Sequence, residues 1–104
     1  MIGFKIIHEV DGQRTEVYTS VAQTQSLFDC LVDKIGDPES WTKLRIHENG
    51  VHALGWRKEG RSGCWYPVRG FKDALDQYFQ QLCTRQDRPT VEIYLWHCLP
   101  VVAQ

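Results

Sequence analysis

The alternation of apolar and polar residues at the start of the chain predicts a β-hairpin. In residues 2–10 every second residue is apolar or histidine, a period of two that is typical of a strand with one buried face. Asp11 and Gly12 then form a dipeptide that favours a tight hairpin turn. The alternation returns through Thr15 and Thr19, so we expect residues 2–19 to form two antiparallel strands.

Helical spacing replaces this alternation in the next segment. Residues on one side of the expected helix recur three or four positions apart, namely Val21, Thr24, Phe28, Leu31 and Ile35. Ser20 and Gln23 have the spacing of a capping box, and Gly36 is the kind of residue at which helices end. The pattern predicts one helix over residues 20–35.

The middle of the chain contains the signals of further strands. Asn49 and Gly50 favour a type I′ turn between a strand at 43–47 and its partner at 51–57. A third, short strand is expected through residues 64–66. It belongs at an edge of the sheet, because the proline that follows it cannot donate a ladder hydrogen bond.

A second helix and a closing strand complete the pattern. Apolar residues after Gly70 form one helical stripe, which consists of Phe71, Ala74, Leu75, Tyr78 and Leu82. This helix is expected to end near Arg85, with Asp73 and Asp76 on its solvated surface. Residues 90–99 are apolar on both strand faces, which is typical of a central strand.

The predicted order of elements is ββαβββαβ, which indicates an α+β domain in which two helices pack against a mixed sheet. We predict one globular domain over residues 1–104, with residues 100–104 as a flexible tail. An opening hairpin, a helix, further strands and a central closing strand parallel to the first resemble the β-grasp arrangement of ubiquitin-like folds. The expected core residues are Phe28, Leu31, Phe71, Leu75, Ile93 and Leu95.

Composition and charge narrow the functional classes. The 104 residues carry 12 Lys and Arg against 13 Asp and Glu, for a net charge of −1. This near-neutral balance argues against nonspecific coating of DNA, which depends on many phosphate contacts. No apolar run approaches the roughly 20 residues of a membrane span, and no signal stretch follows Met1. We therefore expect a cytoplasmic location with no membrane contact.

The sequence contains no recognisable catalytic or metal-binding motif. Its four cysteines, Cys30, Cys64, Cys83 and Cys98, include no Cys-x-x-Cys pair, and we expect reduced, mostly buried thiols. We therefore predict neither an enzyme nor a bound metal ion or cofactor. A cysteine-dependent enzyme is kept as the third functional hypothesis.

The four histidines fall into two pairs that the predicted strands bring near each other. His8 and His97 each continue an apolar strand face, so their rings meet if the first and last strands pair in parallel. Such a pair is either a metal half-site or a pH-sensitive contact, whereas two separately satisfied histidines at the core margin are the more common arrangement. His47 and His52 flank the second hairpin turn, where surface histidines are expected to face each other.

Basic and aromatic side chains are concentrated between Trp56 and Lys72, around a glycine-rich turn. The predicted partner-binding residues are Trp56, Arg57, Lys58, Arg61, Trp65, Tyr66, Arg69 and Lys72. We expect this segment to bind another protein with an acidic patch, as inhibitor, immunity and adaptor domains do. The alternative is a single-stranded nucleic acid, whose phosphates contact the cations while an unpaired base stacks on an aromatic ring.

Overall fold

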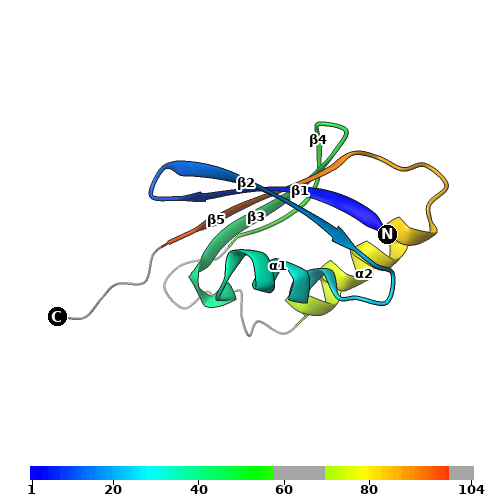
Figure 1. The fold of residues 1–104 in the computed structure, drawn as a ribbon, viewed down its shortest axis with the longest axis horizontal. Helices are drawn as coiled ribbons and strands as arrows, with labels where there is room; N and C mark the ends of the chain where they lie inside the picture. Colours follow the sequence, from blue (N-terminus) through cyan, green and yellow to red (C-terminus); the bar gives the residue numbers. More distant parts are fainter. Residues whose placement is uncertain (58–69, 99–104) are drawn as a thin grey trace.

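Five strands and two helices follow one another in the computed structural model, which describes residues 1–57 and 70–98 (Figure 1). A short 3-10 turn, Pro38–Ser40, precedes the third strand. The elements in chain order are β1 Ile2–Val10, β2 Gln13–Val21, α1 Leu27–Ile35, β3 Trp41–Glu48, β4 Val51–Arg57, α2 Phe71–Thr84 and β5 Val91–His97.

The strands form one mixed sheet in the order β2-β1-β5-β3-β4. The closing strand β5 lies at its centre, parallel to β1 and antiparallel to β3. Both helices cover the same face of this sheet, and the other face carries no helix in the described part of the chain (Figure 1). The α+β class and the β-grasp-like arrangement predicted from the sequence are confirmed. The strand expected at 64–66 and the tail at 100–104 lie outside the described residues.

Both predicted hairpin turns are present, and their backbone explains the residues found there. Asp11 and Gly12 have φ values of 51° and 77°, and Asn49 and Gly50 have values of 52° and 82°. Two successive positive φ angles define the turn whose twist matches that of paired strands, and Asp, Asn and Gly adopt them at low cost. These two dipeptides therefore fix the registers of β1 with β2 and of β3 with β4.

The core lies between the sheet and the two helices. All six residues predicted to be buried belong to it. Two further aromatic residues at its centre, Trp41 and Phe79, have no exposed surface. The Trp41 ring meets Phe28 edge-on at a centroid distance of 5.8 Å, and Phe79 lies 5.9 Å from Phe4. Aromatic contacts of this kind join β1 and β3 to the helices that cover them.

The first helix starts later than the sequence predicted. The hairpin register pairs Val21 with Ile2, so β2 extends through Ser20, and the helix begins only at Leu27. The true N-cap is Ser26, whose hydroxyl accepts a hydrogen bond from the Asp29 amide at 3.1 Å. The expected capping box at the end of the hairpin is therefore wrong, because strand pairing holds that segment extended.

Asp76 on α2 connects the two helices. The prediction that it is a solvated surface carboxylate is therefore wrong. Its Oδ2 accepts a hydrogen bond from the Ser26 hydroxyl at 2.8 Å, and its Oδ1 accepts one from the Phe28 amide at 3.0 Å. A carboxylate at the start of a helix satisfies amides that have no intrahelical partner and also opposes the positive end of the helix dipole. Asp76 thus completes the cap of α1 from the neighbouring helix.

A second polar contact attaches the far end of α2 to the sheet. The Tyr78 hydroxyl donates to Glu48 Oε2 at 2.7 Å, and Arg85 Nη1 donates to Glu48 Oε1 at the same distance. The hydrogen bond from Tyr78, followed by that from Arg85, holds the pKa of the Glu48 carboxyl below its usual range. Burial and the same carboxylate raise the pKa of Tyr78.

These contacts predict an acid-sensitive contribution to stability. A carboxyl with a depressed pKa stabilises the fold above its unfolded value of about 4.3, and the contribution is lost as the pH falls through the lower folded value. We expect Glu48→Gln to lower the free energy of unfolding by about 1 to 2 kcal/mol near neutral pH. The difference from the parent protein should shrink below about pH 4.

Urea unfolding across a pH series measures this effect. Asp33→Asn, on the exposed surface of α1, is a suitable control because it changes a carboxylate outside this contact. A deficit of Glu48→Gln that stays constant down to the acid transition would contradict the ionic role assigned to Glu48.

Candidate functional site

The face of the sheet that carries no helix is the candidate binding surface, and we call it the open face. Strand registers place every second side chain there. Its members are Lys5, Ile7 and Glu9 on β1; Arg14, Glu16 and Tyr18 on β2; Glu92, Tyr94 and Trp96 on β5; Lys43, Arg45 and His47 on β3; and His52 and Arg57 on β4.

A row of aromatic rings crosses the open face over three strands. Trp96 and Tyr94, both on β5, have ring centroids 6.3 Å apart and planes inclined by 24°. Tyr94 lies 4.7 Å from His47 on β3, which meets His52 on β4 at 5.8 Å. All except the exposed His52 are half-buried. The row therefore provides a broad apolar and π-rich contact surface rather than a single protruding side chain.

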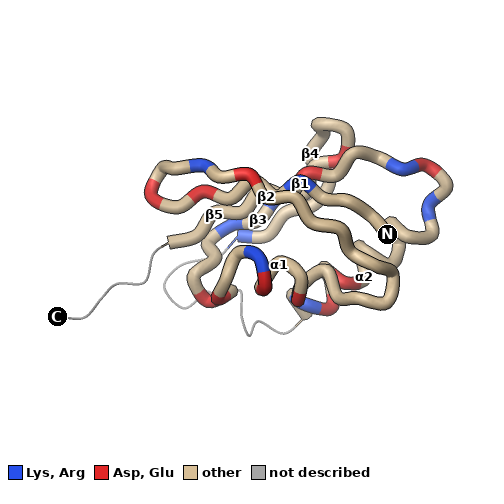
Figure 2. The backbone as a smooth tube through the Cα atoms, viewed as in Figure 1, with Lys and Arg blue, Asp and Glu red and all other residues tan. Residues whose placement is uncertain are grey.

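Cations beside this row have no carboxylate partner within the described residues. Lys43 Nζ lies 4.6 Å from the centre of the Trp96 ring, which is a cation–π contact. Arg45 and Arg57 are exposed, and neither forms an ion pair in the described part of the chain. Figure 2 shows basic positions on β3. This half of the open face is consequently positive.

The other half of the open face is electrically balanced. Lys5 lies 3.4 Å from Glu16 and 3.9 Å from Glu92, and Arg14 pairs with Glu9 at 3.2 Å. Pairing on the same sheet neutralises these charges, so the β1–β2 half attracts a charged partner weakly. The open face therefore has a positive half on β3 and β4 and an electrically balanced half on β1 and β2.

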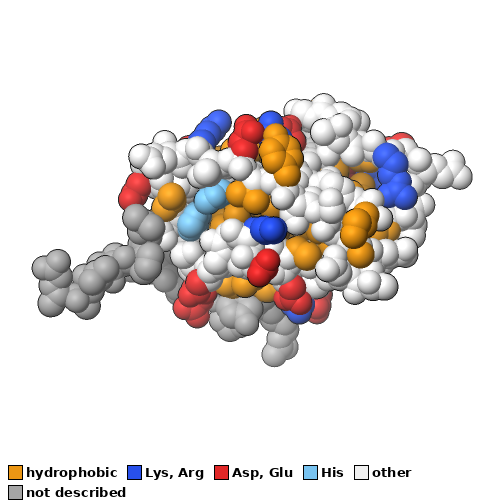
Figure 3. All heavy atoms as spheres, in the orientation of Figure 1, with side chains coloured by type: hydrophobic (Ala, Val, Ile, Leu, Met, Phe, Trp, Pro, Cys, Tyr) orange, Lys and Arg blue, Asp and Glu red, His pale blue; other side chains and the backbone are white. Residues whose placement is uncertain are grey.

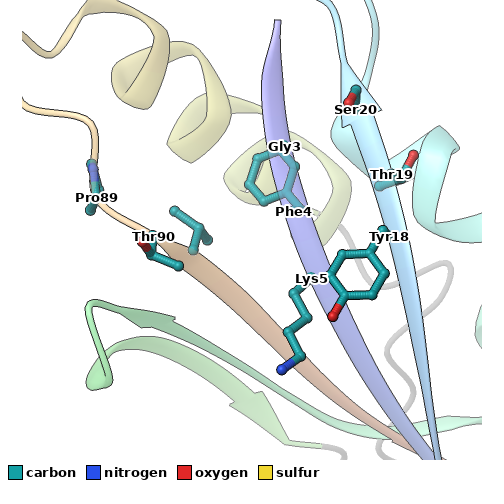
Figure 4. Close-up of a pocket in the computed structure, with 9 residues that line it drawn as sticks. Gly3, Phe4, Lys5, Tyr18, Thr19, Ser20, Pro89 and Thr90 are labelled. Carbon is teal, nitrogen blue, oxygen red and sulfur yellow. The ribbon is translucent and has the colours of Figure 1, made fainter.

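A shallow hollow lies on this balanced half, where β1, β2 and the start of β5 meet. It has a volume of about 580 Å³, and its lining includes Gly3, Lys5, Tyr18 and Thr90. Figure 4 shows the Lys5 and Tyr18 side chains lying side by side over the strands, next to the short residues at Gly3 and Thr90. Tyr18 is 67% exposed. The hollow is open to solvent and presents one phenol ring to a partner.

The space-filling view of the molecule shows how its surface is divided. Figure 3 shows small, separate hydrophobic areas with charged groups between them, and histidine side chains that reach the surface. Single exposed apolar residues are normal for a folded protein. Among the described residues on this side the apolar areas are separate from one another, whereas the open face combines aromatic rings with cations.

The structure divides the predicted partner-binding residues between two faces. Arg57 lies on the open face, opposite Lys43. Trp56 points to the helix side, where its ring meets Phe71 at 5.3 Å, and it is partly buried against the core. Lys72, on α2, pairs with Asp29 at 3.5 Å on the helix side. The remaining predicted residues, Lys58, Arg61, Trp65, Tyr66 and Arg69, lie outside the described part of the chain.

The aromatic row was absent from the predicted site, although the sequence contained its signal. Tyr94 and Trp96 alternate with the buried core residues of β5, and this two-sided apolar pattern predicts a central strand. The central position of β5 is confirmed, but both helices cover the same side. In the part of the chain that the structure describes, the second side therefore remains a surface, and its rings are half-buried by one another and by Lys43.

The histidines at the ends of β1 and β5 do meet. His8 Nδ1 and His97 Nε2 are 3.3 Å apart, with ring centroids separated by 5.4 Å. Burial, and then the neighbouring His8, lowers the pKa of His97. The commoner arrangement, in which each histidine is satisfied separately, is therefore wrong for this pair.

Nucleophilic chemistry has little support among the described residues. Burial, together with Asp29 and Asp33, raises the pKa of the Cys30 thiol, which keeps it protonated and poorly nucleophilic. Cys83 and Cys98 are unpaired, and Cys64 lies outside the described residues. No cluster of three or more metal-ligating side chains occurs in residues 1–57 and 70–98.

Comparison with known proteins yields no match: no family model fits the sequence, and neither a curated protein nor a solved structure is significantly similar to it. The assignment of class therefore depends on the fold and the surface alone, which define a small α+β domain with a β-grasp-like sheet and an open aromatic face. Neither α1 nor α2 is long and apolar enough to cross a membrane.

Proposed function

We propose that this protein is a non-enzymatic binding domain that uses its open face to hold an acidic segment of another protein. The observation that carries the proposal is the row Trp96, Tyr94, His47 and His52 beside the cations of β3 and β4. Aromatic rings and arginines are the residue types that contribute most to protein–protein affinity. A domain that acts by occupying a site on its partner, as inhibitors and adaptors do, requires no catalytic group.

Electrostatics supports a partner with carboxylates on one side of its contact. The β5–β3–β4 half of the open face offers Lys43, Arg45 and Arg57, whereas the β1–β2 half is neutralised by its own ion pairs. Such asymmetry orients a partner and raises its association rate. A polyanion that lay across the whole sheet would gain little attraction from the β1–β2 half, because Glu9 and Glu16 already pair with Arg14 and Lys5.

Substitution of the two arginines tests the surface. We expect Arg45→Ala combined with Arg57→Ala to melt like the parent protein, because exposed surface changes alter stability by less than about 0.5 kcal/mol per site. Binding should weaken about tenfold or more, since each truncated arginine leaves an acidic group of the partner unpaired. Lys72→Ala removes a cation from the helix side and is the matched control.

The assay combines affinity capture with a direct measurement. Proteins from the native host that bind the immobilised parent and the Lys72→Ala control, but not the double variant, are identified by mass spectrometry and then titrated by calorimetry. Equal capture of the same protein by all three forms would place the binding surface elsewhere.

A single-stranded nucleic acid is the second candidate, and the same aromatic row favours it. Rings on an uncovered sheet stack with unpaired bases in several nucleic-acid-binding domains, and nearby cations contact phosphates. Fluorescence anisotropy with a labelled oligothymidine separates the two proposals. Binding that weakens with salt, with a slope of about −0.7 per phosphate contact, and that requires Arg45 and Arg57 would replace the protein partner by a nucleic acid. We expect no such binding at physiological salt.

A further inference from the structure

We infer that His8 and His97 form a binding site for a first-row transition-metal dication such as Zn²⁺. The pair lies at the carboxyl ends of the parallel strands β1 and β5, apart from the aromatic row. Both histidines lie at strand positions that face the helices. Each is only partly buried, so an ion reaches them from solvent. The inference does not depend on the function of the open face.

The distance between the two imidazoles fits one shared metal ion. His8 Nδ1 and His97 Nε2 are separated by 3.3 Å. Two zinc–nitrogen bonds of about 2.0 to 2.1 Å that meet at a tetrahedral angle place their nitrogens about 3.3 to 3.4 Å apart. Without metal, the N–H of one ring donates to the bare nitrogen of the other. An ion replaces that shared proton while the two rings move little.

The sheet itself holds the two ligands in place. The β1–β5 register pairs His8 with Leu95, two residues before His97, and fixes both backbones by ladder hydrogen bonds. Ligands on paired strands lose little conformational freedom on binding, which favours capture by only two side chains. Imidazole nitrogens suit zinc, copper and nickel rather than calcium or magnesium. In the described residues no third ligand joins the pair, so water or a partner's side chain would complete the coordination.

Zinc titration of the full chain tests the site. Calorimetry should show one ion per chain, and the melting temperature should rise by about 6 to 11 °C at zinc concentrations tenfold above the Kd. His8→Gln and His97→Gln should each weaken binding at least tenfold. Two separate variants keep the test valid if either fails to fold. NMR of the imidazole nitrogens should show zinc-induced shifts at His8 and His97.

The other histidine pair supplies the control. His47 and His52 face each other with ring centroids 5.8 Å apart on the open face, and no hydrogen bond joins their rings. His52→Gln should leave zinc affinity unchanged, and so should Cys98→Ser, which removes the exposed thiol next to His97. The inference is overturned if the parent binds no zinc, if both His8→Gln and His97→Gln bind as the parent does, or if Cys98→Ser alone abolishes binding.

Discussion

Leu95→Ala should destabilise the protein by about 2 to 5 kcal/mol, the largest effect that we expect from one substitution. Leu95 has no exposed surface and lies on the central strand, between His8 of β1 and Leu44 of β3. Truncation there removes apolar burial and also leaves a cavity, because ladder hydrogen bonds on both sides prevent the strand from moving inward. Urea unfolding followed by tryptophan fluorescence measures the loss.

A leucine at the edge of the same sheet is the appropriate comparison. Leu54, on β4, is 37% exposed, so Leu54→Ala removes less buried surface, and water fills the space it leaves. We expect it to cost less than about 1 kcal/mol. If Leu95→Ala also cost less than about 1 kcal/mol, Leu95 would not belong to the core that the structure shows.

Asp76→Ala should destabilise the protein by about 2 kcal/mol, which is large for a residue on a partly exposed helix face. The substitution leaves the Phe28 amide and the Ser26 hydroxyl without their charged acceptor at the start of α1. Hydrogen bonds to ionised groups contribute more than neutral ones, and the carboxylate also interacts favourably with the helix dipole. Thermal unfolding by circular dichroism near neutral pH is a sufficient measurement.

Asp73 provides a control one turn away on the same helix. It is exposed in the first turn of α2, and Asp73→Ala should change stability by less than about 0.5 kcal/mol. Asp76→Asn retains one acceptor oxygen and should fall between the two alanine variants. Equal losses for Asp73→Ala and Asp76→Ala would mean that the loss of a negative charge near the start of α2, rather than of the contact between helices, determines the effect.

The sequence by itself determined the features that depend on neighbouring residues. Asp11-Gly12 and Asn49-Gly50 specified the two hairpin turns, because few other residues adopt positive φ angles at low cost. Periods of two and of three to four residues identified the strands, the second helix and the six predicted core residues. The two-sided apolar pattern of β5 also indicated its central place in the sheet.

Tertiary structure decided the features that depend on contacts between residues far apart in the sequence. Ser20 carries a local capping signal, yet pairing with β1 keeps it in a strand, and the cap of α1 comes from Ser26 and from Asp76, which is 50 residues away. Tyr94 and Trp96 remain at the surface because both helices cover the opposite side of the sheet. Only the parallel register of β1 and β5 brings His8 within 3.3 Å of His97. A strand's own residues specify its two faces, but the placement of other elements determines which of them is covered.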